Sequence, residues 1–436
     1  MTERPVAARL LVAIWLGQLA SLIGSSLTAF VLGVWVYQRT GSVLQFSLIF
    51  LAATVPALLV APPAGTAADS GDRRVLMLRA DTAAAAGTLA LALLVAADAL
   101  AVWHIYLATA LTAGASTVHQ VAYQSMTPAL VGTRHLARFN GFMQISRAVQ
   151  IAAPLVAGAL VVTIGIGGVL AIDLLTFAIA AGTLLLVRLP AAITRPPGDS
   201  TAARPRGGAA EGWRHLRARP GLLHLVVVFG VFNFLFGIAG VLIQPLILSF
   251  SDPATLGVLM FAGGAGLFAG SLVMGAWGGP RRRSRAVLGG LAGGGVALAL
   301  HALAPSPWLI GVVAPLFLFT LPIVNSSTMT LLQLKTAPEL LGRVTAAARV
   351  IGDAAVPLAY LLAGPLADAV AEPLMAPGGA LADTAGAVIG TGPGRGIALL
   401  FVVSGLAMVL LAAITAATRT LRRADDLPDA VPATAV

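Results

Sequence analysis

Four ionisable residues stand out inside long apolar runs of the sequence, where an uncompensated charge is costly. They are Arg147, Asp173, Arg349 and Asp353. A charged side chain in the middle of a lipid bilayer costs at least roughly 2.5–3.5 kcal/mol, so charges at such places are candidates for function. Their chemistry would be to bind and release a proton or an ion. We therefore take these four residues as candidates for proton coupling.

Arg349 and Asp353 are four positions apart, so in a helix they share one face and can neutralise each other. Two interpretations are open. Asp353 exchanges a proton while Arg349 tunes its acidity, or the two residues form a structural ion pair that holds their helix.

Arg147 and Asp173 would lie at similar depths if each apolar run is a helix, because the difference is within the reach of an arginine side chain. The two residues can therefore pair. Arg147 is the better functional candidate, as a cation that repels protons or holds an anionic group. A structural role is favoured for Asp173.

The composition determines which elements can position these residues. The chain has 436 residues, of which 58% are hydrophobic and 10% charged, and its mean hydropathy is +0.93. A typical soluble domain carries about 25% charged residues. A soluble core of this size cannot absorb so much apolar surface, whereas lipid accepts it on the outside of the molecule. The sequence therefore predicts an all-α integral membrane protein whose main partner is the lipid bilayer.

Twelve apolar runs are long enough to cross a hydrocarbon core of about 30 Å, which takes about 20 helical residues. These runs cover residues 10–37, 43–66, 75–97, 102–126, 138–163, 166–188, 221–249, 253–278, 285–304, 307–334, 341–369 and 395–418. A stretch rich in Pro, Gly and Arg separates two sets of six. We predict a six-helix bundle over residues 1–188, a cytoplasmic linker over 189–220, a second bundle over 221–418 and a disordered cytoplasmic tail over 419–436.

The basic residues orient these helices. Most of them lie in short clusters before the first run, after each even-numbered run and at the end of the chain, and only Arg39 and Arg395 fall in the opposite loops. Cytoplasmic loops carry such an excess of Lys and Arg. We therefore expect both termini in the cytoplasm and a multi-pass protein of the inner (plasma) membrane. Because the net charge of +10 is spread over these clusters, it does not indicate nucleic acid as a partner.

Several classes of chemistry are excluded by what the sequence lacks. It has no cysteine, which excludes disulfides and cysteine-ligated zinc, and it has neither a GxxxxGK[ST] nor an HExxH run. We predict no enzyme activity, no metal and no cofactor. The acidic segment around Asp368, Glu372 and Asp383 is interpreted as a solvated external loop.

Short motifs in this chain resemble the major facilitator superfamily. Gly65-Thr-Ala-Ala-Asp69-Ser-Gly71-Asp-Arg73-Arg74 resembles the family's loop between helices 2 and 3, and Ala153-Pro154-Leu-Val-Ala-Gly158 is similar to the antiporter motif of its exporters. The macrolide-efflux and enterobactin-exporter branch is resembled by Asn140-Gly141, by Ile172-Asp173-Leu-Leu-Thr-Phe177 and by Gly342-Arg343-Val344.

This resemblance implies two pseudo-symmetric six-helix bundles, alternating access, and export of an amphipathic drug or secondary metabolite (siderophore- or macrolide-like) in exchange for protons. We expect a monomer. The resemblance implies a gating latch at Gly65, Asp69, Arg73 and Arg74, and an antiporter-like role for Pro154 and Gly158. It also implies that helices 1, 4, 7 and 10 surround a central cavity, whose polar lining would be Gln18, His119, Gln120, Asn233, Gln244 and Asn325.

Alternatives remain open for these residues and for the function. The Gln and Asn side chains can instead join neighbouring helices by hydrogen bonds, and His119 can be a hydrogen-bonded packing residue. A metabolite importer of the same fold, or a non-transporting membrane scaffold or sensor, would share most of these features. The intramembrane Arg and Asp residues argue against the scaffold, because packing in lipid does not require them.

Overall fold

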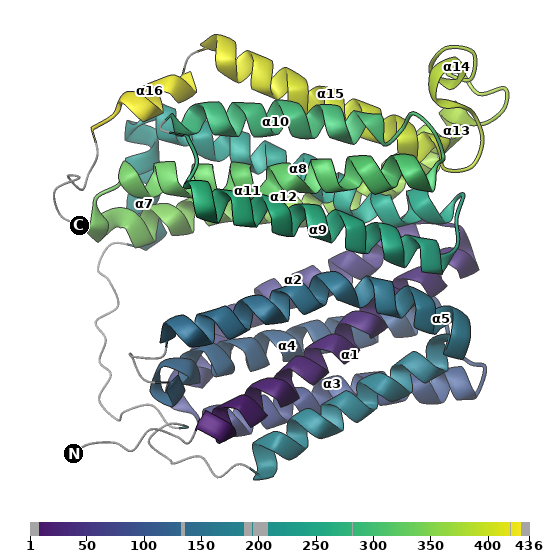
Figure 1. Ribbon diagram of the computed structural model, residues 1–436, viewed down its shortest axis with the longest axis vertical. Helices are drawn as coiled ribbons and strands as arrows, with labels where there is room; N and C mark the ends of the chain where they lie inside the picture. Colours follow the sequence, from purple (N-terminus) through teal and green to yellow (C-terminus); the bar gives the residue numbers. More distant parts are fainter. Residues whose placement is uncertain are drawn as a thin grey trace. The chain divides into compact units, whose positions relative to one another are not determined.

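A computed structural model describes residues 8–131, 136–186, 194, 208–280, 282–418 and 420–428, and this part of the chain contains helices and no strand. Figure 1 shows the helices as long, roughly straight rods. In chain order they are α1 (Ala8–Thr40), α2 (Val43–Ser70), α3 (Arg73–Ala96), α4 (Val102–Val131), α5 (Leu136–Leu186), α7 (Gly208–Ala218), α8 (Pro220–Leu248), α9 (Pro253–Trp277), α10 (Arg283–Leu300), α11 (Pro307–Leu334), α12 (Pro338–Pro365), the π-helix η2 (Leu366–Ala371), α13 (Glu372–Met375), α14 (Ala385–Ile389), α15 (Arg395–Thr418) and α16 (Thr420–Asp426).

Within the described residues, nine helices are long and apolar enough to cross a membrane. One of these candidates is the 38-residue stretch Val149–Leu186, which is about twice as long as one crossing needs. Its helix α5 is interrupted at Gly165, whose φ of 69° is a conformation that glycine adopts without strain. The twelve crossings expected from the sequence stay a prediction.

The outer surfaces of these helices are strongly apolar. Large side chains such as Leu59, Val162 and Trp308 are 71%, 63% and 88% exposed. Lipid accepts such side chains, and it also explains why the elements are helices, because a helix satisfies its backbone hydrogen bonds within itself. Prolines inside membrane helices are tolerated for related reasons, and α2 alone carries Pro56, Pro62 and Pro63.

The chain divides into two compact units, and two helices contribute to both. The first unit contains Met1–Gly41, Leu48–Ala202 and Pro253–Phe261, and the second contains Ser42–Ser47, Ala203–Asp252 and Ala262–Val436. The beginning of α2 and the beginning of α9 therefore each belong to a different unit from the rest of the same helix.

In the first unit, α1 packs along α5, and α3 packs against both α4 and α5 (Figure 1). A buried cluster joins α1, α3, α4 and α5 through Leu32, Leu91, Ile105 and Leu170. The packing therefore places the end of α3 and the start of α4 beside the second arm of α5, on which Asp173 also lies.

In the second unit, glycines allow helices to approach closely. A methyl group on Gly295 of α10 would come within 2.5 Å of the Gly405 carbonyl oxygen of α15, and one on Gly266 of α9 would overlap the Pro315 backbone of α11. Small residues at such crossings bring backbones together where lipid gives no hydrophobic drive for association.

The segment between residues 189 and 220 includes the helix α7, which packs on α12. Glu211 of α7 forms an ion pair with Arg343 of α12, and Gly212 lies directly on the Arg343 backbone, where a Cβ atom would not fit. The second half of the predicted linker is therefore a docked helix.

The prediction of a disordered tail over 419–436 is wrong for its first part, because residues 420–426 form α16. Asp425 accepts hydrogen bonds from the Ser284 side chain and backbone, and the Lys335 Nζ donates to the Asp425 carbonyl oxygen at 2.9 Å. The helix is ordered because its acid meets the N-terminus of α10, where an anion is stabilised. Residues 429–436 lie outside the described part.

The interpretation of Asp368 and Glu372 as part of a solvated loop is also wrong. The Asp368 carboxylate caps the N-terminus of α2 and accepts hydrogen bonds from Ser42 Oγ at 2.7 Å and from the backbone N–H groups of Val43 and Leu44 at 3.0 and 2.9 Å. Glu372 Oε1 accepts from the Ile397 N–H near the start of α15 at 3.2 Å. Both acids satisfy backbone donors that a helix leaves unpaired at its first turn.

Replacing Asp368 with Ala should destabilise the protein by about 1–2 kcal/mol, because the first turn of α2 loses its cap. The measurement is the melting temperature of the purified protein in detergent. Asp383→Ala serves as the matched control, since Asp383 lies in the same segment and is exposed. Equal melting temperatures for the two variants would contradict a stabilising cap.

Candidate functional site

Asp173 is almost completely enclosed, with an exposed fraction of 1%. Three hydroxyl groups donate to its carboxylate: Ser25 at 3.3 Å and Thr28 at 2.9 Å from α1, and Thr88 at 3.3 Å from α3. A carboxylate that accepts several hydrogen bonds is satisfied without a counter-charge. The arrangement favours the structural role expected for Asp173, as the point where α1, α3 and α5 are joined.

Arg147 lies on α5, but its side chain lies outside the described part of the structure. The predicted pairing of Arg147 with Asp173 therefore stays a prediction. The Asp173 carboxylate accepts hydrogen bonds from three other residues, Ser25, Thr28 and Thr88.

His119 of α4 has a partner that the sequence reasoning missed. Its Nδ1 atom lies 2.7 Å from Oδ1 of Asp81 on α3, and the side chains of His119 and Asp81 are 17% and 9% exposed. The contact does not have the geometry of a hydrogen bond, and among the described residues His119 Nδ1 and Asp81 Oδ2 have no hydrogen-bond partner. The contact is an ion pair when His119 is protonated.

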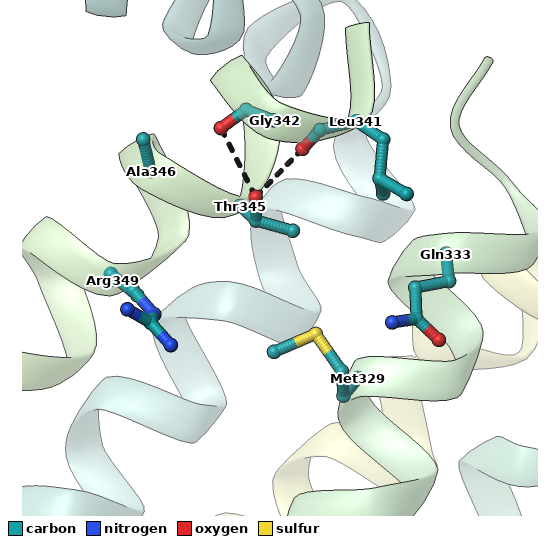
Figure 2. A pocket seen from close by; sticks show the side chains of 7 residues that line it. All are labelled: Met329, Gln333, Leu341, Gly342, Thr345, Ala346 and Arg349. Atoms are coloured by element: carbon teal, nitrogen blue, oxygen red, sulfur yellow. Dashed lines mark hydrogen bonds between the residues drawn. The ribbon is translucent and has the colours of Figure 1, made fainter. Parts of the chain in front are cut away.

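Arg349 and part of α11 line an open cavity of about 540 Å³ in the second unit. Figure 2 shows the Arg349 guanidinium and the Gln333 amide coming from different helices toward this space. The Thr345 hydroxyl donates to the carbonyl oxygens of Leu341 and Gly342 at 2.7 and 3.1 Å, so it is engaged with its own helix. The complete lining is Met329, Gln333, Leu341, Gly342, Thr345, Ala346 and Arg349.

This cavity combines apolar side chains with one cation and one amide. Such a mixture is typical of small-molecule sites, in which apolar surface gives affinity and a few polar groups fix orientation. Asp353 lies one turn after Arg349 on α12, but its side chain is outside the described residues. The predicted interaction of Arg349 with Asp353 therefore stays untested.

The polar residues predicted to line a central cavity occupy different environments. Gln18 Nε2 and Gln244 Oε1 are buried and have no hydrogen-bond partner among the described residues, whereas Gln120 and Asn325 are exposed. The Asn233 amide lies against Gly352 of α12, which fits the alternative that it joins helices. None of the predicted lining residues borders the cavity at Arg349, and their common cavity stays a prediction.

The residues of the predicted latch make contacts within the first unit. Arg74 donates to the carbonyl oxygens of Leu184 and Leu185 at 2.8 and 3.0 Å, and so caps the C-terminus of α5. Arg73 Nε donates to the Ala68 carbonyl oxygen at 3.1 Å. Asp69 and Gly65 lie in the last turns of α2, where Asp69 is exposed. These bonds join helix termini, and the latch itself stays a prediction.

Pro154 and Gly158 of the antiporter-like motif lie at a close crossing of α5 with the first turn of α9. A methyl group on Gly158 would come within 2.5 Å of the Pro253 carbonyl oxygen, and one on Gly257 would overlap the Pro154 carbonyl oxygen. The two helices approach so closely because glycine stands at both contact points. The motif therefore acts here as a packing surface.

Asp81 could have been found from the sequence, because it is an acid inside the predicted run 75–97, like the four residues first considered. Its nearness to Arg79 conceals it, since a basic neighbour suggests the end of a membrane segment. The sequence alone does not mark Gln333, near the end of the predicted run 307–334, as a site residue. Met329 and Thr345 carry no sequence signal that separates them from ordinary helical residues, so only the packing of α11 and α12 identifies them.

Comparison with known families gives one match that covers most of the chain. The model described as Major Facilitator Superfamily matches residues 14–360. Macrolide efflux protein A of Streptococcus pyogenes is 25% identical over 363 residues, which cover 82% of this chain and 89% of that protein. The protein of the same name from Enterococcus faecalis is 26% identical over 324 residues, or 73% of this chain and 99% of its own length. The resemblance to the macrolide-efflux branch is thereby confirmed.

Solved structures show the same fold at low sequence identity. A bacterial homologue of the iron transporter ferroportin in an inward-facing state has a TM-score of 0.71 at 14% identity and covers 96% of this chain and 99% of its own. A bacterial homologue of the human lysosomal transporter Spinster has a TM-score of 0.70 at 16% identity, covering 96% and 98%. The predicted all-α transporter fold is confirmed.

Replacing Gly158 with Ala should destabilise the protein by about 1–3 kcal/mol, because the added methyl group meets the backbone of α9 and forces the helices apart. Gly182→Ala on the same helix α5 is the matched control, since a Cβ atom there meets nothing within 4 Å. Thermal unfolding in detergent measures both. A Gly158 variant as stable as the Gly182 variant would show that the crossing is loose.

Replacing Asp173 with Leu should leave the hydroxyl groups of Ser25, Thr28 and Thr88 without their shared acceptor, and should lower the free energy of unfolding by about 1–3 kcal/mol. Asp173→Asn, which keeps one acceptor oxygen, should lose less. Asp98→Asn, at an exposed turn of the same unit, is the control. The melting temperatures of the three variants are compared, and we expect them to rise from Asp173→Leu through Asp173→Asn to the control. An Asp173→Leu variant as stable as the control would show that the hydrogen bonds to Asp173 do not stabilise the protein.

Proposed function

The chain belongs to the major facilitator superfamily and is a membrane transporter of small molecules, and we propose that it exports an amphipathic drug or secondary metabolite in exchange for protons. The substrate class we propose is macrolide-like, or siderophore-like in size and amphipathic character. Transport would proceed by alternating access of a site within the helical bundle to the two sides of the membrane. The main support is the length over which the relatives named macrolide efflux protein A align.

The polar groups of the described helices suit an amphipathic substrate. The cavity at Arg349 offers apolar contacts from Met329 and Leu341 together with the Gln333 amide. Gln18 and Gln244 carry buried amide atoms that lack a protein partner in the described part. Unpaired polar atoms in lipid surroundings are unfavourable, so water or the polar groups of a bound substrate would complete them.

Proton coupling would rest on Asp353, with Arg349 one turn before it on α12. A proton on the Asp353 carboxyl leaves the Arg349 charge uncompensated, whereas loss of that proton restores a neutral pair. The charge of the cavity beside Arg349 would therefore change by one unit in each cycle. Arg147 would act as a second fixed cation.

The distribution of Lys and Arg supports a position in the inner (plasma) membrane with both termini in the cytoplasm. In that orientation α7 and α16 would lie on the cytoplasmic side. We propose that the transporter works as a monomer and takes its energy from the proton gradient, without a cofactor.

The test is the accumulation of radiolabelled erythromycin, a macrolide, in efflux-deficient bacteria that express the full chain. Wild-type protein should lower accumulation, and a protonophore should abolish this effect because it removes the gradient. Asp353→Asn should behave like protonophore-treated wild type, whereas Asp383→Asn, an exposed acid in the segment after α12, should transport normally.

Two results would overturn the proposal. Higher accumulation in expressing cells would indicate an importer. Unchanged accumulation of erythromycin and of a panel of other amphipathic compounds, from protein shown to be present in the membrane, would remove the support for drug export.

A further inference from the structure

The contact between Asp81 and His119 lies inside the membrane-spanning part of the first unit. Asp81 is about eight residues into α3, which places it about 12 Å from the start of that helix. The second titratable group comes from the neighbouring helix α4, so the pair depends on how α3 and α4 pack. A carboxylate and an imidazole in contact are together neutral when they hold one proton between them.

The surroundings of the pair are apolar. Ala80 and Ala84 of α3 pack with Ala115 of α4 and Phe177 of α5 in a buried cluster next to it. The Tyr123 ring lies one turn from His119, with its centroid 6.2 Å from that of the imidazole. Burial in such a place disfavours a net charge, so the pair should keep its single proton and release it only when water reaches it.

The pair differs from Asp173, the other buried acid of this unit. Asp173 accepts three hydroxyl hydrogen bonds and needs no proton to be satisfied. Asp81 Oδ2 and His119 Nδ1, by contrast, lack an aligned partner among the described residues. One carboxylate is thus held fixed, whereas the other is left with capacity for a proton.

The helices packed against the pair carry other titratable and charged groups. Thr88 of α3 donates a hydrogen bond to Asp173 and is seven residues from Asp81. The position on α3 that meets Asp173 is therefore about 10 Å from Asp81 along the helix axis. Arg79 is exposed, and Arg39 lies in the last turn of α1. The set on the packed helices is Tyr37 and Arg39 on α1, Arg73, Arg74 and Arg79 on α3, His104, Tyr106 and Tyr123 on α4, and Asp173 on α5, together with Arg9 on α1 and Arg138 and Arg147 on α5, whose side chains lie outside the described part.

We propose that Asp81 and His119 form a second proton-binding site of this transporter, which is loaded and emptied once in each transport cycle. The inference rests on the proposed proton-driven export. A hydronium ion on the acidic side gives its proton to the imidazole and an N–H bond forms beside the Asp81 carboxylate. The same bond breaks when water on the opposite side takes the proton. One proton is consumed and one released, with no change of oxidation state.

The experiment uses everted membrane vesicles that contain the full chain, with radiolabelled erythromycin as the probe. Wild type should accumulate the probe when a pH gradient is imposed and should also exchange it at equal pH. Asp81→Asn and His119→Gln should keep the exchange at equal pH but lose accumulation down to the level of protonophore-treated vesicles. Asp98→Asn is the matched control, because it removes an exposed carboxylate of the same unit.

A structural role for the pair predicts a different pattern, in which accumulation and exchange fall together. That result, or full accumulation by both variants, would overturn the inference. Absence of erythromycin transport by wild type would instead refute the proposed export function. The proton-binding role of Asp81 and His119 is then tested by a measurement that needs no substrate.

That second measurement counts protons bound by the purified protein. When the pH is lowered from about 8 to about 5, wild type should take up one proton more than the double variant Asp81→Asn/His119→Gln. Equal proton uptake would overturn the inference whatever the substrate is. If the double variant does not fold, the same comparison is made with His119→Gln alone, for which the expected difference is again one proton.

Discussion

Hydrocarbon offers no hydrogen-bond partners, so every backbone polar group inside the bilayer must find its partner within the protein, and a charged side chain there is costly unless it is matched. The described helices meet this constraint in several ways. Three hydroxyls satisfy Asp173, and Arg395, only 4% exposed, donates to the carbonyl oxygens of Ile389 and Ala302. Asp368 is matched with the free N–H groups of a helix start. In each case the dipoles of hydroxyl, carbonyl or N–H groups that point at the charge stabilise it.

The same solvent also explains the role of glycine in this fold. Lipid tails are as apolar as the helix surfaces, so burial of apolar area gives little drive for helices to associate. Close backbone contact supplies the attraction instead, and it requires the absence of a side chain at the crossing. Gly158 with Gly257 and Gly295 with Gly405 are two such crossings, one in each unit. The antiporter-like motif is thus also a structural device.

These constraints separate the ionisable residues into two groups with different uses. A group that accepts several hydrogen bonds from other helices, such as Asp173, holds those helices together and contributes to stability. A group with capacity left, such as Asp81 beside His119, changes its interactions when a proton binds. The cavity at Arg349 adds a fixed cation against apolar walls. A transporter that couples substrate to protons needs groups of the second kind.

The sequence by itself determined the class of the protein. Hydropathy and the spacing of apolar runs predict the membrane helices, because lipid imposes the same length and composition on every crossing. The motifs at Gly65, Pro154 and Gly342 indicated the family. The sequence also identified Asp173 and His119 as candidates, because an ionisable residue is conspicuous in an apolar run.

Only the tertiary structure decided what those residues touch. The partner of His119 is 38 positions away on another helix, the acceptor role of Asp368 depends on the start of α2, and α16 is ordered by Ser284 and Lys335. Hydropathy cannot predict such contacts, since it reports where a residue lies relative to the membrane but not which face its helix turns toward a neighbour.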